Sequence, residues 1–192
     1  MTSAEASRGG HAPPRDPQII LIGLRCSGKT TVAKILGEQL HLAVDDLDTA
    51  VLKRLGRDSI AEIWRTLGEA AWRKAEAAVL EEVLSRGPGI LALGGGTPMI
   101  DSARGTLVAH RERSGCRIVY LRAAPATLAR RLQMNGNDRP PLIGKSAAEE
   151  MEAIFAQRDA FYRILADMTI ESDDLSPAQI AGIIAREYGR ST

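Results

Sequence analysis

Short apolar runs alternate along this chain with longer segments in which apolar residues recur every three or four positions. The apolar runs predict five strands, at residues 18–23, 42–45, 90–93, 117–121 and 168–170. Segments with helical spacing follow the first four, and "SPAQIAGIIAREYG" follows the last, with serine at the N-cap and proline at the first helical position. This alternation is typical of a parallel sheet covered by helices on both faces.

Two segments interrupt the pattern. A helical block at residues 59–86 lies between the second and third predicted strands, and Ser59 and Glu62 at its start have the spacing of a capping box. The segment "NGNDRPPLIGK", residues 135–145, contains Pro140–Pro141, which cannot continue a helix. A polar, glycine-flanked loop of this length is typical of an active-site lid or of disorder, and we expect a lid.

Composition bounds the class of protein. The 192 residues suffice for one domain, predicted at 17–192, after a disordered tail at 1–16 that is rich in Ser, Gly, Pro and Ala and lacks the apolar region of a secretory signal. With 25 Lys+Arg against 24 Asp+Glu, the charge of +1 argues against a nucleic-acid or membrane-surface protein. No apolar run approaches the ~20 residues of a membrane span. Two cysteines do not make a disulfide framework, so we expect a reducing cytoplasm.

The stretch "GLRCSGKT", residues 23–30, fits the phosphate-binding pattern G-x-x-x-x-G-K-[ST]. It follows a predicted strand and opens a predicted helix, so backbone N–H groups point at phosphate oxygens. Lys29 adds a positive charge, and the Thr30 hydroxyl can bind Mg²⁺. The pattern predicts a nucleoside triphosphate site whose expected contacts are Cys26, Ser27, Gly28, Lys29, Thr30 and Thr31.

Polar residues follow the second and third predicted strands. Asp46 and Asp48 are two positions apart and project to the same side if the chain stays extended. The stretch "LALGGGTP" ends the third strand. In a doubly wound sheet both meet the P-loop at the carboxyl ends of the strands. With no guanine-reading "NKxD" tetrapeptide, these landmarks favour a small-molecule kinase.

The P-loop, "DDLD", "SIAEIWRTLGEAAWRKAE", "LALGGG", "RPPLIGK" and "QRDAFYR" together make the chain resemble the shikimate kinase family from residue 18 to about 188. The resemblance implies a P-loop, nucleoside-monophosphate-kinase-like α/β/α fold with a five-stranded parallel sheet. It also implies a helical substrate-binding region at about 46–86 and a lid at about 135–147. The implied reaction is phosphorylation of the 3-hydroxyl of shikimate by ATP with Mg²⁺, by an enzyme expected to be a monomer.

The resemblance also implies roles for single residues. Asp48 matches the aspartate that binds substrate hydroxyls and can accept a proton, and Asp46 matches the aspartate on the Mg²⁺ side. Arg139, in the lid, matches the arginine that reaches the phosphates, so Lys29, Asp48 and Arg139 are the expected catalytic residues. The alternative for either aspartate is that it caps the following helix.

Arg73 and Arg163 match the family pair that binds the substrate carboxylate, a task suited to the planar fork of a guanidinium. Glu76 at i+3 could position Arg73, and Asp159 at i−4 could position Arg163. The alternative is a pair of solvated surface arginines.

Three further assignments concern backbone and aromatic positions. The family has a glycine triplet that lets the backbone approach the substrate, matched here by Gly94, Gly95 and Gly96. Arg131 is expected to stack on adenine, although the sequence does not distinguish it from Arg130 in this role. Trp64 and Trp72 match positions where many relatives have phenylalanine against the apolar side of the substrate, so we expect both to face the pocket. The alternative is that they are plain core aromatics.

Cys26 departs from the family, since many members have glycine there, which adopts positive φ freely, and a thiol at a helix N-terminus can have a lowered pKa.

Two other functions compete with this reading. One is a gluconate-type or nucleoside monophosphate kinase on the same scaffold, and the other is a non-catalytic nucleotide-binding relative. The combination of Asp48, Arg73, the glycine triplet and Arg163 suits a carboxylate-bearing polyol, which disfavours the first. The presence of Lys29, Asp48 and Arg139 disfavours the second.

Overall fold

A computed structural model describes residues 18–135 and 147–189 of the chain. The predicted tail, Arg139 and nearly all of the predicted lid lie outside the described residues. All five predicted strands are present, with bounds that differ from the prediction by at most two residues: β1 (Gln18–Ile22), β2 (Val44–Asp46), β3 (Gly89–Ala92), β4 (Arg117–Arg122) and β5 (Met168–Glu171). They form one parallel sheet in the order β2-β3-β1-β4-β5, which confirms the predicted fold class.

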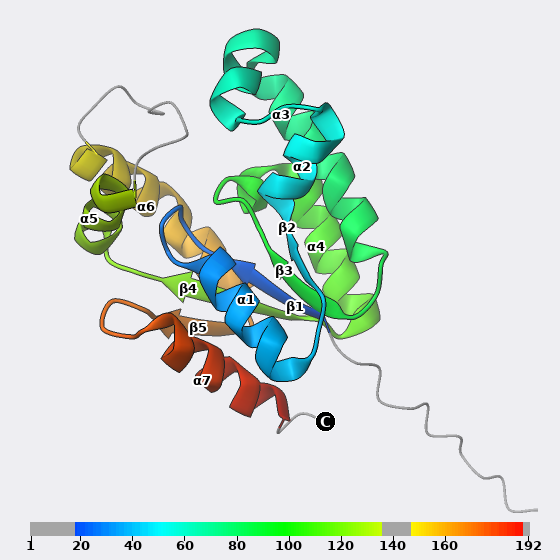
Figure 1. The fold of residues 1–192 in the computed structure, drawn as a ribbon, viewed down its shortest axis with the longest axis vertical. Helices are drawn as coiled ribbons and strands as arrows, with labels where there is room; N and C mark the ends of the chain where they lie inside the picture. Colours follow the sequence, from blue (N-terminus) through cyan, green and yellow to red (C-terminus); the bar gives the residue numbers. More distant parts are fainter. Residues whose placement is uncertain (1–17, 136–146, 190–192) are drawn as a thin grey trace, which may run out of the picture.

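Helices cover both faces of this sheet (Figure 1). α1 and α7 lie together on one face, and α3, α4 and α6 lie on the other. The helices are α1 (Lys29–Leu40), α2 (Leu47–Leu55), α3 (Ile60–Leu84), α4 (Asp101–Ser114), α5 (Pro125–Asn135), α6 (Ala147–Leu165) and α7 (Pro177–Gly189), with a short 3₁₀ helix, η1 (Thr97–Met99). Within residues 18–135 and 147–189, no helix combines the length and apolarity needed to cross a membrane.

Strand β1 shows why both faces are apolar. All five of its residues are buried, and successive side chains point to opposite faces. Ile19 and Leu21 pack with the residues of α1 and α7, whereas Ile20 and Ile22 pack with those of α3, α4 and α6. A central strand of this kind needs a continuous apolar run, which is the feature that predicted it.

The helical block is divided and projects from the sheet. Ser59 Oγ accepts a hydrogen bond from the backbone N–H of Glu62 at 3.1 Å, which confirms the predicted N-cap of α3. Gly68, at φ +81° and ψ 162°, interrupts the helix with a kink. α2 and the first part of α3 therefore extend beyond the sheet, at the top of Figure 1.

The strand order fixes where a ligand binds. In the sheet, β3 lies on one side of β1 and β4 on the other. The chain passes from β1 to β2 and β3 on one side and then crosses to β4 and β5 on the other, so β1 borders the point at which the strand order reverses. Ligands of open α/β sheets bind at the carboxyl ends of the strands at this point. The loop after β1 and the loop after β3 both lie there.

Candidate active site

The P-loop occupies residues 23–28, between β1 and α1. Gly23 needs the absence of a side chain, because a Cβ there would lie 2.5 Å from the carbonyl oxygen of Leu121. Cys26 adopts φ +64°, the left-handed conformation that favours glycine. The backbone strain expected for a non-glycine residue at this position is therefore present at Cys26. The left-handed conformation costs roughly 1–2 kcal/mol for most residues.

A cavity of about 430 Å³ opens over this loop and the start of α1. Its lining contains every predicted nucleotide contact that lies in the described residues: Cys26, Ser27, Gly28, Lys29, Thr30, Thr31 and Arg131. Leu175, Pro177 and Ile180 form an apolar wall opposite the phosphate loop. The cavity thus combines a charged, N–H-rich end with an apolar end, as a nucleotide requires.

Lys29 and Arg131 supply the positive charge of this cavity. Lys29 Nζ donates to the carbonyl oxygen of Leu24 at 2.8 Å and lies 3.4 Å from Ser27 Oγ, which holds the ammonium over the loop. Arg131 Nη2 donates to the carbonyl oxygen of Ser172 at 2.9 Å. Arg130 is exposed and is absent from the lining, so the geometry favours Arg131 of the two.

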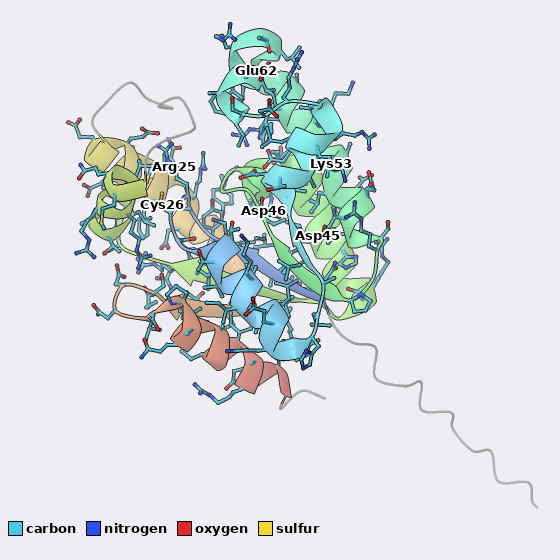
Figure 2. All side chains as sticks on the ribbon, in the orientation of Figure 1. Arg25, Cys26, Asp45, Asp46, Lys53 and Glu62 are labelled. Atoms are coloured by element: carbon cyan, nitrogen blue, oxygen red, sulfur yellow. The ribbon has the colours of Figure 1, made fainter. Side chains whose placement is uncertain are left out.

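Thr30 and Asp46 are joined directly. Thr30 Oγ1 donates to Asp46 Oδ2 at 2.7 Å, while Asp46 Oδ1 accepts from the backbone N–H of Thr49 at 3.0 Å. Asp46 is therefore the N-cap of α2 as well as the partner of the P-loop threonine (Figure 2). This pair of oxygen atoms fits Mg²⁺, which binds through one or two protein oxygens plus phosphates and water.

The expectation that Asp46 and Asp48 share one side of an extended chain is wrong. Asp46 has extended φ and ψ, but α2 begins at Leu47, so Asp48 lies in the first helical turn. The turn directs Asp48 to the glycine triplet: a Cβ on Gly94 would be 2.5 Å from Asp48 Oδ1. The carboxylate reaches the end of β3 through the helix rather than along a strand.

A second, narrow cavity also borders the P-loop. It has about 20 Å³ of space, so any organic ligand must displace its walls to enter. The lining comes from the P-loop, α3, the loop after β3 and α6: Leu24, Arg25, Trp64, Arg73, Gly95, Gly96, Ile154 and Arg158. Three of these eight residues are arginines, whose guanidinium groups suit an anionic ligand.

Arg73 is held by two carboxylates. Its Nη1 donates to Glu76 at 2.9 Å, and its Nε and Nη2 donate to Glu69 at 3.1 and 2.9 Å. Glu76 is 1% exposed and also accepts from the hydroxyl of Thr97. Burial alone would lower the pKa of Arg73, but Glu76 and Glu69 outweigh burial and raise it. Glu76 thus positions Arg73, as its i+3 spacing predicted.

Gly96 permits this arrangement. A Cβ at Gly96 would lie within 2.9 Å of the guanidinium carbon of Arg73. A side chain at Gly95 would crowd the P-loop backbone, 3.1 Å from the nitrogen of Arg25. The triplet is therefore required for close approach between β3, α3 and the P-loop.

Arg163 lies away from this cavity. Its Nε donates to Asp159 at 2.9 Å, and its Nη2 is 3.5 Å from Glu171. The predicted Asp159–Arg163 contact exists, but it holds Arg163 on a different face of α6. Residues five positions apart on a helix point about 140° apart, and it is Arg158 that faces the cavity.

Arg158 was not predicted from the sequence, although the motif "QRDAFYR" contains both arginines. Arg158 Nη1 donates to the carbonyl oxygen of Gly95 at 2.7 Å, and the hydroxyl of Tyr162 donates to the same oxygen. Burial raises the pKa of Tyr162 to about 12, so it stays a neutral donor. Tyr162 and Arg158 are four apart and share one helix face, the signal that identifies Arg158.

Arg25 is a further missed residue. It occupies a variable position of the P-loop, lines the second cavity, and forms an ion pair with Glu150 of α6 (Figure 2). The side chains are 13% and 2% exposed, so this pair is largely withdrawn from water. The P-loop pattern allows any residue here, and only the fold shows its proximity to Arg73 and Arg158.

The two tryptophans differ in environment. Trp64 lines the second cavity, with the guanidinium carbon of Arg73 5.9 Å from its ring centroid. Trp72 is 1% exposed and belongs to the apolar core. The expectation that both tryptophans face the pocket therefore holds for Trp64 and fails for Trp72.

Comparison with known proteins places these features in a family. The family model for shikimate kinase matches residues 25–188. The shikimate kinase of Limosilactobacillus fermentum is 41% identical over 166 residues, covering 86% of this chain and 92% of that protein. A shikimate kinase structure from Acinetobacter baumannii in complex with shikimate superimposes with a TM-score of 0.83 at 28% identity, covering 92% and 94% of the two chains.

A gluconokinase from Sinorhizobium meliloti is also similar, with a TM-score of 0.58. At 17% identity, with 91% and 93% of the two chains covered, this likeness shows a shared fold and nothing finer. The family model and the relatives in sequence agree on one assignment. By its sequence across most of its length, the chain belongs to the shikimate kinase family.

Proposed function

We propose that this chain transfers the γ-phosphate of ATP to the 3-hydroxyl of shikimate, giving shikimate 3-phosphate and ADP. One observation carries the proposal: different residues of a single loop line the two cavities. Leu24 and Arg25 line the narrow cavity, and residues 26–31 line the nucleotide cavity. A phosphoryl donor and an acceptor bound there would meet at the P-loop, as in-line transfer requires.

The nucleotide side supplies charge and orientation. Backbone N–H groups of the loop and of the α1 N-terminus bind phosphate oxygens, and Lys29 neutralises charge that develops on the transferred group. Thr30 and Asp46 would hold Mg²⁺, which neutralises phosphate charge when it is bound. Arg139 would add a further positive charge at the same phosphates.

The substrate side orients the hydroxyl. Arg73 and Arg158 bind the carboxylate of shikimate, and we assign to Arg158 the role first expected of Arg163. Asp48 accepts the proton of the 3-hydroxyl as its oxygen bonds to phosphorus and the bond to ADP breaks. Glu76 acts through Arg73, keeping the fork of the guanidinium turned toward the cavity.

We further propose that the enzyme is a monomer and is located in the cytoplasm. All of the assigned groups come from one chain, so a monomer suffices. The two cysteines, Cys26 and Cys116, do not make a disulfide framework, which supports the proposal of a reducing cytoplasm.

A coupled assay of ADP release tests the proposed reaction against its alternatives. Shikimate, gluconate and nucleoside monophosphates are compared at equal concentration with folded protein and Mg²⁺. We expect turnover with shikimate alone. Turnover with gluconate or a nucleoside monophosphate instead would identify another kinase, and ATP binding without turnover on any of them would identify a non-catalytic relative.

A further inference from the structure

Trp64 carries a polar group that the proposed mechanism does not use. Its indole Nε1 is buried and makes no hydrogen bond with any group in the described part of the chain. Buried indole N–H groups usually have a partner, because an unmade hydrogen bond in the interior is costly. Since Trp64 also lines the substrate cavity, a ligand in that cavity could supply the missing acceptor.

The neighbourhood of Trp64 indicates which ligand atom this is. The Arg73 guanidinium lies 5.9 Å from the centroid of the indole ring, so the ring borders the arginine assigned to the substrate carboxylate. The cavity has about 20 Å³ of space, room for roughly one water molecule, so few acceptors compete there with a ligand oxygen. A carboxylate offers about four acceptor positions, and Arg158 already donates from Nη1 to the carbonyl oxygen of Gly95. The carboxylate can therefore accept from the indole as well as from Arg73 and Arg158 when Arg158 donates a single hydrogen bond to it.

We propose that the indole N–H of Trp64 donates a hydrogen bond to the substrate carboxylate, beside Arg73. This inference rests on the proposed function, and it makes Trp64 a specificity-determining residue rather than an apolar wall. A wall needs only an aromatic ring, which phenylalanine provides. The indole adds a hydrogen-bond donor, which favours a substrate with an anionic oxygen beside Arg73.

The test compares Trp64→Phe with Trp72→Phe, which changes the core tryptophan outside the cavity. Trp64→Phe keeps an aromatic ring and removes the N–H. Titration calorimetry should show a Kd for shikimate raised about 10- to 100-fold in Trp64→Phe, the usual loss for one hydrogen bond to a charged group. The kcat at saturating shikimate should change little, and Trp72→Phe should bind like the wild type.

A second measurement reports on the proton itself. ¹⁵N-labelled Trp72→Phe retains one indole N–H resonance, that of Trp64, and shikimate should shift its proton downfield. An unmoved resonance at saturation, or wild-type affinity in Trp64→Phe, would overturn the inference while leaving the kinase assignment intact. If the wild type neither binds nor phosphorylates shikimate, the proposed function falls and this inference falls with it.

Discussion

The choice between Arg158 and Arg163 is the sharpest prediction of the site. Arg158→Ala removes a guanidinium that lines the narrow cavity, whereas Arg163→Ala removes one that binds Asp159 and Glu171 outside it. Both changes delete the same side chain from the same helix. They differ in whether a substrate carboxylate loses a partner.

The expected magnitudes follow from what each arginine contacts. A charge-assisted hydrogen bond contributes about 1.5–3 kcal/mol, so Arg158→Ala should raise the KM for shikimate about 10- to 150-fold. The carbonyl of Gly95 keeps its bond from Tyr162, so the glycine triplet should stay in place. Arg163 is 45% exposed, and its ion pairs should contribute about 1 kcal/mol or less to stability.

The assay is ADP release at saturating ATP over a range of shikimate concentrations, with thermal unfolding to show that both variants are folded. We expect Arg158→Ala to change the KM for shikimate far more than the KM for ATP. The KM for shikimate of Arg163→Ala should stay within about threefold of the wild-type value. A large rise in KM for Arg163→Ala, with a small one for Arg158→Ala, would refute the assignment and restore the prediction from sequence.

Three further outcomes are expected. Gly96→Ala should abolish or strongly weaken shikimate binding, because the added methyl group would crowd the guanidinium of Arg73. Gly105→Ala is the control: its position in α4 has open space, so the variant should be active and its free energy of unfolding about 0.5–1 kcal/mol higher. Iodoacetamide followed by mass spectrometry should alkylate Cys26 before Cys116, since burial raises the pKa of the Cys116 thiol, and ATP should protect Cys26; equal or nucleotide-independent labelling would contradict this. Burial would raise the pKa of Asp159, but hydrogen bonds from Arg163, Arg122 and Tyr120 outweigh burial and lower it. The ionised carboxylate therefore stabilises the fold at pH values above the ordinary pKa of 3.8, and this stabilisation is lost as the pH falls through the lowered pKa. Asp159→Asn should therefore cost about 1–3 kcal/mol at pH 7 and less at pH 3, and an equal cost at both would contradict the reasoning.

The fold could be predicted because its signals are local. The three inner strands, β1, β3 and β4, contain buried apolar runs, and the P-loop fixes the junction of β1 and α1 in one stretch of eight residues. Ser59 and Ser176 mark helix starts through contacts only three residues long. Such features depend on little beyond their neighbours in sequence.

The structure departs from the expectations where a long-range arrangement decides. Arg158 and Arg163 occur in one motif and are both suited to a carboxylate, and only the docking of α6 selects between them. Asp159 correctly predicted a partner for Arg163, but that contact turns the arginine away from the cavity. Trp72 likewise follows its helix into the core. Spacing identifies which side chains can meet, and packing decides which side of the helix faces the ligand.

The P-loop has two functional faces, and this explains why its pattern alone could not specify the substrate. Residues 26–31 line the nucleotide cavity, and they include three of the four positions that the phosphate-binding pattern fixes, Gly28, Lys29 and Thr30. Leu24 and Arg25 occupy variable positions and face the narrow cavity. A protein can thus keep its phosphate chemistry while changing the acceptor through those two positions. In this chain Arg25 lines the narrow cavity together with Arg73 and Arg158, and three guanidinium groups in one cavity suit an anionic ligand.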